Sequence, residues 1–579
     1  MLRPQLIKSI LGSSRLSSKG LSHSSLRLFA GSNKRLLSTL KKTTKSKTYS
    51  QNSLIALGIS ITAIASIYSY NQSQNYLSAD VPKWSDIELT PEIVSQHNKK
   101  DDCWVVIKGQ VYDLTDFLTS HPGGQKVILR YAGKDATKIF VPIHPPDSID
   151  KFIPPEKHLG PLIGEFEEEV EELSEEEIDR LERIERKPPL SQMINLHDFE
   201  TIARQILPPP ALAYYCSAAD DEVTLRENHN AYHRIFFNPK ILVDVKNIDL
   251  TTEFFGDKTT APFYISATAL AKLGNPEGEV DIARGAGREG IHQMISTLAS
   301  CSFDEIADAR VEGQNQWYQL YVNADRSITE KAVRHAEERG MKGLFITVDA
   351  PSLGRREKDM KMKFEADSSV QSDDDEVDRS QGAARAISSF IDPSLSWKDI
   401  GFIQSITKMP IVIKGVQRKE DVFLAIEHGL QGVVLSNHGG RQLDYTRAPV
   451  EVLAEVMPEL RAKGLDKKIE IYIDGGVRRG TDVLKALCLG AKGVGLGRPF
   501  LYANSSYGDK GVQRAIQLLK DELEMNMRLL GVTKIEDLGP ELLDTRNIYN
   551  RSVPVAKDYL YEQNYGRMAG AAFRPGIED

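Results

Sequence analysis

From residue 195 onward the chain alternates short apolar runs with segments of helical periodicity. Eight runs rich in β-branched and aromatic residues each precede a stretch whose apolar positions recur every three or four residues. Such runs are typical of strands buried on both faces, and a helix after each strand makes successive strands parallel. The runs are PFYISAT (262–268), HQMIST (292–297), NQWYQLY (315–321), GLFITVDA (343–350), PIVIKGV (410–416), GVVLSNHG (432–439), IEIYIDGG (469–476) and GVGLGRPF (493–500). They predict an α/β fold, a (β/α)8 TIM barrel over residues 195–555.

Changes of composition divide the rest of the chain. Residues 84–162 form a small block rich in His, Pro and aromatic residues, which we interpret as a separate domain. Residues 163–194 are dense in acids (EFEEEVEELSEEEIDRLERIERK) and offer little to a core. They predict a linker, within which a solvent-exposed helix can form. The segment 364–383, after the fourth run, is too polar to pack and predicts a surface loop. The polar, Gly-rich residues 556–579 predict a C-terminal tail.

The first eighty residues are of a different kind. Residues 1–50 carry eleven Lys or Arg, and the first carboxylate of the chain is Asp80. That composition is typical of a mitochondrial transit peptide. An uncharged apolar run at 54–68 follows, short of the roughly 20 residues of a membrane span. Residues 1–80 therefore predict a bipartite presequence that directs the protein to the mitochondrial intermembrane space, with membrane contact through the presequence alone; a retained inner-membrane anchor is the alternative.

Charge and cysteine content exclude several functions. The 579 residues have a formal net charge of −8 and no basic stripe in the central chain, which argues against nucleic-acid binding. The four cysteines are scattered without a CxxC pair, so neither a disulfide framework nor a zinc site is expected.

Reactive side chains gather where the predicted strands end. In a barrel of parallel strands, the carboxyl ends of the strands carry the active site. Stability alone does not require a lysine, a histidine, acids and arginines around one rim, so this clustering predicts an enzyme. The residues are Thr268, Ser296, Gln319, Tyr321, Thr347, Asp349, Lys414, His438, Arg441, Asp474 and Arg498.

The small domain resembles the cytochrome b5 family throughout DDCWVVIKGQVYDLTDFLTSHPGGQKVILRYAGKDATKIF. His121 lies in His-Pro-Gly-Gly, and His144 follows in VPIHPP. The resemblance implies a small α+β domain that binds haem b, with these two histidines as the axial ligands of a six-coordinate iron. A b5-like fold that has lost haem and binds a lipid or steroid is the alternative, and the presence of both histidines argues against it.

The barrel resembles the FMN-dependent L-2-hydroxy acid oxidising family over essentially its full length. The motifs are AYYCSAADDEVTLREN, SATALAKLGNPEGE, QWYQLY, TVDAPSLGRREKD, PIVIKGV, SNHGGRQLD, DGGVRRGTDVLKALCLGA and GLGRPFLY. Where the family usually has Ser-Gly-Ala, this chain has Ser217-Ala218-Ala219. If that glycine needed a positive φ, Ala218 would cost about 1 kcal/mol.

The resemblance assigns roles that suit each side chain. His438 is the expected base, because imidazole titrates near neutral pH, and Asp349 is its orienting partner. Arg441 suits bidentate capture of a carboxylate. Tyr214 and Tyr321 are expected to hydrogen-bond the substrate, and Arg356 is a second arginine near it. Without the family, ordinary aromatic packing is the alternative interpretation of Tyr214.

The same resemblance implies an FMN site. Lys414 is expected at the N1–C2=O edge of the flavin, where a fixed ammonium favours reduction; a satisfied interior lysine is its alternative interpretation. The ends of the seventh and eighth strands match the recurrent phosphate site of such barrels. The expected FMN-binding residues are Ala267, Thr268, Ala269, Ser296, Gln319, Thr347, Lys414, Asp474, Gly475, Gly476, Arg478, Gly497 and Arg498.

The fusion of both modules implies the overall reaction. We expect oxidation of L-lactate to pyruvate on FMN, by hydride transfer or through a carbanion, and transfer of single electrons through haem b to cytochrome c. Ala269 and Leu298 would leave space for a methyl group, which favours lactate over bulkier acids. A homotetramer, in which residues 556–579 contact a neighbouring subunit, is also implied. The alternatives are an oxidase that uses oxygen and a non-catalytic haem-binding sensor.

Overall fold

The computed structural model describes residues 88–121, 125–166, 173–367 and 391–551. The predicted presequence, the His-Pro-Gly-Gly turn beyond His121 and the predicted C-terminal tail lie outside these residues. Of the predicted loop at 364–383, residues 364–367 are described and continue helix α13 (Glu357–Asp367). Within the described ranges, no helix combines the length and apolarity needed to cross a membrane.

The small domain contains a four-stranded antiparallel sheet in the order β1-β2-β3-β4. Its central strand β2 reads DCWVVI, and five of its six residues are buried, because the two faces of the sheet cover different apolar clusters. One cluster, around Val105 and Leu118, also contains side chains of the two helices that lie between His121 and His144 in the sequence. The elements are α2 (Pro91–Val94), β1 (Asn98–Lys99), β2 (Asp102–Ile107), β3 (Gln110–Asp113), α3 (Gln125–Leu129), α4 (Thr137–Phe140), α5 (Ser148–Phe152) and β4 (His158–Pro161).

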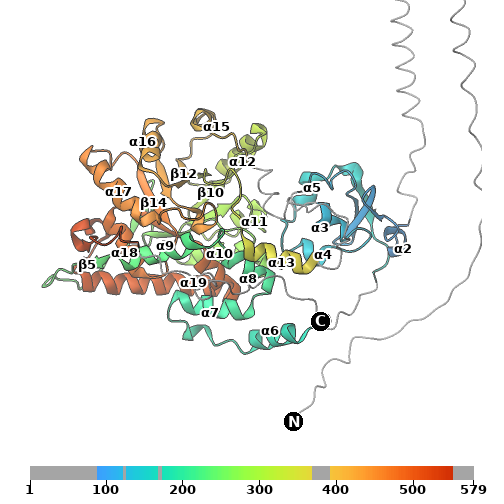
Figure 1. The fold of residues 1–579 in the computed structure, drawn as a ribbon, viewed down its shortest axis with the longest axis horizontal. Helices are drawn as coiled ribbons and strands as arrows, with labels where there is room; N and C mark the ends of the chain where they lie inside the picture. Colours follow the sequence, from blue (N-terminus) through green and yellow to red (C-terminus); the bar gives the residue numbers. More distant parts are fainter. Residues whose placement is uncertain (1–87, 122–124, 167–172, 368–390, 552–579) are drawn as a thin grey trace, which may run out of the picture. The chain divides into compact units, whose positions relative to one another are not determined.

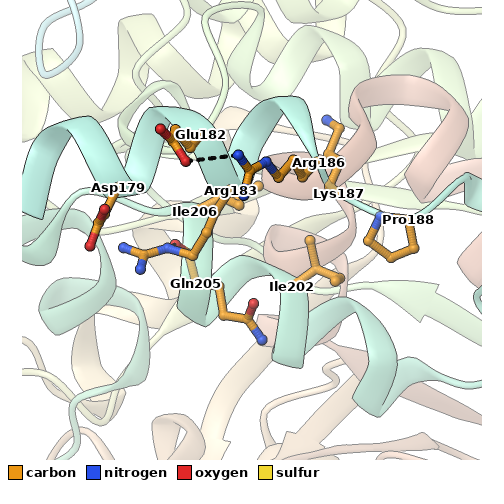
Figure 2. A pocket seen from close by; sticks show the side chains of 9 residues that line it. All are labelled: Asp179, Glu182, Arg183, Arg186, Lys187, Pro188, Ile202, Gln205 and Ile206. Carbon is orange, nitrogen blue, oxygen red and sulfur yellow. Dashed lines mark hydrogen bonds and ion pairs between the residues drawn. The ribbon is translucent and has the colours of Figure 1, made fainter. Parts of the chain in front are cut away.

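The acidic linker contains helix α6 (Glu175–Glu185), in which no residue is buried. Ser174 caps its first turn by accepting a hydrogen bond from the Glu177 amide. The three glutamates of that turn stabilise the helix, because their negative charges lie at the positive end of the helix dipole. Arg180 and Arg183 donate to the carbonyls of Ile206 and Gln205, at the end of α7 (Leu196–Ile206). Figure 2 shows the surface groove between these two helices. None of the predicted site residues lines that groove.

The eight predicted strands form a closed parallel barrel, with neighbours in the order β8 to β15 and β15 paired to β8. The expected fold is therefore confirmed. Each strand is shorter than its apolar run. In every run except PIVIKGV, whose strand ends with the run at Val416, the last residues leave the sheet to form the strand-end loops. The strands are β8 (Phe263–Ile265), β9 (Gln293–Ser296), β10 (Gln316–Leu320), β11 (Leu344–Thr347), β12 (Ile411–Val416), β13 (Gly432–Leu435), β14 (Glu470–Asp474) and β15 (Gly493–Leu496).

Aromatic side chains fill the interior of the barrel. Phe254, from a hairpin before the first strand, contacts Tyr264, Trp317 and Tyr472 of three barrel strands. All four are almost fully buried. The interior is thus a packed core, and the open ends of the strands are left to carry chemistry.

Helices surround the strands, as Figure 1 shows. The long α19 packs against α7 and α10, and its backbone leaves the helical conformation at Tyr507 and Gly508. The helices and remaining strands of this part are α8 (Pro209–Cys216), α9 (Val223–His233), β5 (Phe236–Phe237), β6 (Thr252–Phe254), β7 (Asp257–Thr259), α10 (Gly278–Arg288), α11 (Phe303–Asp308), α12 (Arg326–Glu338), α15 (Ile400–Ile406), α16 (Lys419–Glu427), α17 (Pro449–Ala462), α18 (Gly480–Leu489), α19 (Arg498–Leu530) and β16 (Leu543–Asp544).

Candidate active site

The expected base and its partner are in contact at the strand ends. Nδ1 of His438, after β13, lies 3.0 Å from Oδ1 of Asp349, after β11. Burial lowers the pKa of His438 and Lys414 lowers it further, while Asp349 opposes both effects. Burial alone would raise the pKa of Asp349, but His438 and Lys414 outweigh it, and the net effect is a lowered pKa. A neutral imidazole therefore faces an ionised carboxylate at neutral pH.

The loop that carries His438 has an unusual backbone. His438, Gly439 and Gly440 have φ values of +59°, +64° and +79°, in the left-handed region. A non-glycine residue there is strained, and such strain persists only where the surroundings hold it. The imidazole is thus presented by a sharply folded loop directly after a buried strand.

Lys414 is buried within an ion pair. Its Nζ lies 3.4 Å from Oδ2 of Asp474 and 3.3 Å from Oγ of Ser436. Burial would lower the pKa of Lys414, but Asp474 and Asp349 outweigh it and raise the pKa. Ser436 donates to Asp474 and accepts a hydrogen bond from the His438 amide. Sequence reasoning missed Ser436, whose only signal was its position in the SNHGG motif.

Two guanidinium groups lie close to the expected substrate tyrosines. Arg441 lies over the Tyr214 ring, with its Cζ 4.9 Å from the ring centroid, and donates to the carbonyls of Tyr214 and Ser217. Burial, and next the charge of Arg441, lower the pKa of Arg356 to about 10. Among the described residues neither arginine forms an ion pair with a carboxylate, and Nε of Arg356 is buried without a hydrogen-bond partner. Burial raises the pKa of Tyr321, which therefore keeps its proton.

A chain of hydrogen bonds crosses three neighbouring strands. Ser296 donates to Oε1 of Gln319 at 3.3 Å, and Nε2 of Gln319 donates to the Thr347 hydroxyl at 2.9 Å. Thr347 in turn pairs in register with Lys414 of β12. The predicted row of flavin-contacting side chains is therefore brought together as one polar band. Ala267, Thr268 and Ala269 lie just after β8 and are all partly exposed.

The residues of the predicted phosphate site follow β14 and β15. Gly475 and Gly476 have φ values of +97° and +81°, and a Cβ on Gly476 would come within 2.1 Å of the Asn228 carbonyl oxygen. Only glycine suits this turn. Gly497 precedes the first residue of α19, so the amides at the start of that helix face the same end of the barrel. Nε of Arg478 lies 3.6 Å from Oε2 of Glu200.

The side chain of Arg498, which is expected at the phosphate, also forms three hydrogen bonds with the backbone of this chain. Its guanidinium donates to the carbonyls of Tyr215, Ser217 and Gly439, each at 2.9 Å. These bonds use one N–H of each guanidinium nitrogen, so the side chain links α8 to the His438 loop. The amide of Arg498, at the start of α19, is the group of this residue best placed for an anion.

The backbone of Ala218 is not strained, although the family usually has glycine at this position. It is buried and is not among the residues with positive φ, so its backbone has no need of glycine. The expected backbone penalty does not arise.

The two histidines of the small domain face each other. The ring centroids of His121 and His144 are 6.1 Å apart. A metal–imidazole bond is about 2 Å long, so two imidazoles on opposite sides of one iron have ring centres roughly 6 Å apart. His144 Nδ1 contacts the Phe140 carbonyl at 3.2 Å, which leaves Nε2 free as a ligand. Burial lowers the pKa of His144 to about 4, so it is the neutral, ligating form that is present. The pair fits a haem.

The fold and these two sites define a class. Residues 203–545 match the FMN-dependent dehydrogenase family, and residues 90–163 match the cytochrome b5-like haem/steroid binding domain. The chain belongs to the FMN-dependent dehydrogenase family and carries a b5-like domain in front of the barrel. FMN and haem are its cofactors.

Particular relatives carry both modules or the barrel. The chain is 84% identical to the L-lactate dehydrogenase (cytochrome) of Wickerhamomyces anomalus over 540 residues, 93% of this chain and 94% of that protein. It is 56% identical to the L-lactate dehydrogenase (cytochrome) of Saccharomyces cerevisiae over 546 residues, 90% and 92% of the two chains. Among solved structures, a mutant flavocytochrome b2 with pyruvate bound superposes with a TM-score of 0.62 at 58% identity, covering 71% of this chain and all of that one.

Proposed function

We propose that the chain oxidises L-lactate to pyruvate on FMN and passes the electrons singly through haem b to cytochrome c. The observation that carries this is the neutral His438, paired with ionised Asp349 near the buried Arg356 and the partly exposed Arg441, neither of which has a carboxylate partner among the described residues. A 2-hydroxy acid supplies what these groups need, namely a carboxylate for the arginines and a proton for the imidazole. The relatives named above act on L-lactate with a cytochrome.

Substrate binding is assigned to Arg441, Arg356, Tyr214 and Tyr321. The two guanidiniums repel each other, and a bound carboxylate between them would relieve that repulsion and satisfy the unpartnered Nε of Arg356. The guanidinium of Arg441 also packs over the ring of Tyr214. Tyr321, neutral because of its burial, can donate to a substrate oxygen. These contacts orient the hydroxyl-bearing carbon toward His438.

Proton removal is assigned to Nε2 of His438. Nδ1 is engaged by Asp349, which fixes the ring orientation and leaves Nε2 as the free acceptor. As the imidazole becomes charged, the carboxylate stabilises it across 3.0 Å without being protonated itself. Both hydride transfer and a carbanion route remain compatible with this arrangement.

The strand-end residues fit FMN. Bound FMN supplies a two-electron acceptor that can release its electrons one at a time. The buried ammonium of Lys414 lies beside the polar band of Ser296, Gln319 and Thr347, where it would stabilise negative charge on a flavin edge. Gly475 and Gly476 allow the loop after β14 to pack closely against α9, and in this loop and at the start of α19 Arg478 and the amides of Gly497 and Arg498 would be the donors to a phosphate. Asp474 would act through Lys414.

In the small domain, His121 and His144 would hold the iron of haem b. Haem with two imidazole ligands supplies a one-electron carrier without an open coordination position. The bond from His144 Nδ1 to Phe140 fixes the imidazole that faces the iron.

The basic, acid-free leader supports a mitochondrial location, in the intermembrane space, reached through a bipartite presequence in residues 1–80. A homotetramer in which residues 556–579 contact a neighbouring subunit is part of the same proposal. We also propose that residues 84–162 form the haem domain, residues 163–194 the linker and residues 195–555 the barrel domain.

Rapid-mixing spectroscopy of the purified full-length protein tests the function. L-lactate should bleach the flavin band first, and the haem should then be reduced, with cytochrome c reduced last. Stoichiometric peroxide with an oxidised haem would instead identify an oxidase. A preparation without FMN that ignores lactate would identify a haem-binding sensor.

A further inference from the structure

Two buried amides join the His438 loop to a helix outside the barrel. Nδ2 of Asn228, on α9, donates to Oδ1 of Asn437 at 2.8 Å, and Nδ2 of Asn437 donates back to Oδ1 of Asn228 at 2.7 Å. Each residue is 1% exposed. Asn437 immediately precedes His438, so this reciprocal pair holds the residue from which the imidazole loop begins.

The orientation of the Asn437 amide is fixed by its other contacts. Its Oδ1 also accepts from the Gly440 amide at 3.1 Å, and its Nδ2 also donates to the Arg447 carbonyl at 3.1 Å. If the Asn437 amide were flipped, its N–H groups would face the Gly440 N–H and its oxygen would face the Arg447 carbonyl oxygen. Asn437 therefore needs a partner that both donates and accepts, and Asn228 is that partner.

The same turn of α9 lies against the expected phosphate loop. A Cβ on Gly475 would lie 3.2 Å from Nδ2 of Asn228, and one on Gly476 would lie 2.1 Å from its carbonyl oxygen. Nδ1 of His229 lies 2.8 Å from the Gly476 carbonyl. Asn228 and its neighbour thus contact the loops after β13 and β14, which carry the base and the glycines.

The beginning of α9 contacts the distal part of the His438 loop. Asp444 accepts hydrogen bonds from the amides of Val223 and Thr224, at 3.2 and 2.7 Å. A Cβ on Gly440 would lie 2.8 Å from the Leu225 amide nitrogen. Helix α9 therefore braces the loop at several points, and Asn228 is the one whose side chain reaches the residue beside the base.

We propose that Asn228 is a positioning residue for the reaction: its amide holds Asn437, and through it the strained backbone of His438, against the loop of Gly475 and Gly476. This inference rests on the proposed role of His438 as the base. Proton transfer requires the acceptor to lie within hydrogen-bond reach of the substrate. Filling of the phosphate loop and correct placement of the imidazole are thereby linked through one side chain.

Asn228→Asp in the full-length holoenzyme tests the proposal. An ionised carboxylate can accept from Asn437 but cannot donate to its Oδ1, so the pair breaks. A protonated carboxyl group restores one donor and one acceptor in nearly the same shape. Burial raises the pKa of a carboxyl group, so the acid form is accessible by moderate acidification. The titratable groups next to the pair in sequence are Glu227, His229 and His438. On the loops packed against the pair, Asp474 precedes Gly475, and Arg447 accepts from Asn437 through its carbonyl.

At pH 8 we expect kcat for L-lactate to fall by about 10²-fold in Asn228→Asp, the effect of a small misplacement of a catalytic group. KM should change much less, and the isotope effect with 2-deuterated lactate should rise. Between pH 8 and pH 6 the activity relative to wild type should recover in Asn228→Asp and stay low and flat in Asn228→Leu. If Asn228→Leu does not fold, Asn228→Ser takes its place.

A second readout does not use turnover. FMN binding to the deflavinated full-length protein, followed by flavin fluorescence, should weaken about 10-fold in Asn228→Asp, because the side chain beside Gly475 no longer holds the His438 loop against the glycine loop. The haem spectrum should be unchanged.

Gln316→Glu is the matched control. Nε2 of Gln316 donates to Oε1 of Gln293 at 2.8 Å in another buried amide pair, at the amino-terminal ends of β10 and β9, away from the strand ends that carry His438. This variant should keep wild-type kcat and FMN affinity at all pH values. Asn228 variants within twofold of wild type in both readouts, or an equal loss in the control, would overturn the inference. A wild-type protein inactive on lactate would overturn the proposed function instead.

Discussion

The imidazole of His438 and the carboxylate of Asp349 meet across 3.0 Å at the ends of two strands that are not neighbours in the barrel. Strand β12, which carries Lys414, lies between them. A base, an acid and an ammonium therefore come from three successive strands. Asp349 and Lys414 shift the pKa of His438 in opposite directions, and each also shifts the pKa of the other. This coupling makes the pH dependence of the enzyme a test of its geometry.

Replacing His438 by glutamine removes the only side chain assigned to proton removal. We expect kcat for L-lactate to fall by about 10²- to 10⁴-fold, the usual contribution of general base catalysis. FMN and haem should remain bound, because neither the polar band of Ser296 and Gln319 nor the histidine pair of the small domain involves His438. Steady-state kinetics and the absorption spectrum measure this. Near-normal lactate oxidation would refute the role of His438 as base.

Asp349→Asn separates the two functions of the carboxylate. Asp349 raises the pKa of His438 against burial, so its removal lowers that pKa further. The base must be neutral to act, and kcat/KM falls as the pH drops through the pKa of the free enzyme. The acid limb of the pH profile should therefore move to lower pH, while the plateau falls because the imidazolium is less stabilised. A limb that moves to higher pH would contradict the assigned contact.

The buried charge of Arg356 should destabilise the protein when no substrate is bound. Its guanidinium is buried, has an unpartnered Nε and lies near Arg441. In Arg356→Met we expect a melting temperature at least equal to that of wild type without ligand. The stabilisation given by saturating pyruvate should shrink, and kcat/KM should fall by about 30-fold, equivalent to about 2 kcal/mol. Thermal unfolding with and without pyruvate checks both effects. A variant that melts lower but binds pyruvate normally would exclude Arg356 from the carboxylate site.

Much of the fold could be predicted from local pattern. Runs such as PIVIKGV and GLFITVDA are β-branched, short and followed by helical periodicity, and the strands form inside them. The strand limits could not be predicted. In GVGLGRPF, for example, the sheet pairing ends at Leu496 and a helix begins at Arg498, although apolar residues lie on both sides of this boundary. Where a strand stops depends on hydrogen bonds to its neighbours, which sequence pattern does not encode.

The candidate site follows the same division. That strand-end residues such as Asp349 and Lys414 share one rim follows from the barrel itself. Their mutual contacts do not: Ser436 links Lys414, Asp474 and the His438 amide although a serine in a loop carries no strong signal. The resemblance implies a phosphate role for Arg498, but it gives no sign that the same side chain contacts three carbonyls. Side-chain direction depends on packing between segments far apart in the chain.

Lys414→Met should move the pH profile in the direction opposite to Asp349→Asn. Lys414 lowers the pKa of His438, so without the ammonium that pKa rises and the acid limb of kcat/KM moves to higher pH. Flavin reduction should slow, because negative charge on the flavin edge loses its counter-charge. The buried carboxylate of Asp474 also loses its partner, which should destabilise the protein by about 3 kcal/mol.

The double variant Lys414→Met/Asp474→Asn separates these effects of Lys414. It removes the uncompensated charge, so most of the melting temperature should return. Flavin reduction should remain slow, and the acid limb should remain displaced, because both depend on the ammonium and not on the fold. Thermal unfolding and pH-dependent rapid-mixing kinetics on the same preparations provide the comparison. If flavin reduction recovers together with the melting temperature, Lys414 acts only as an interior ion-pair partner, which is its alternative interpretation.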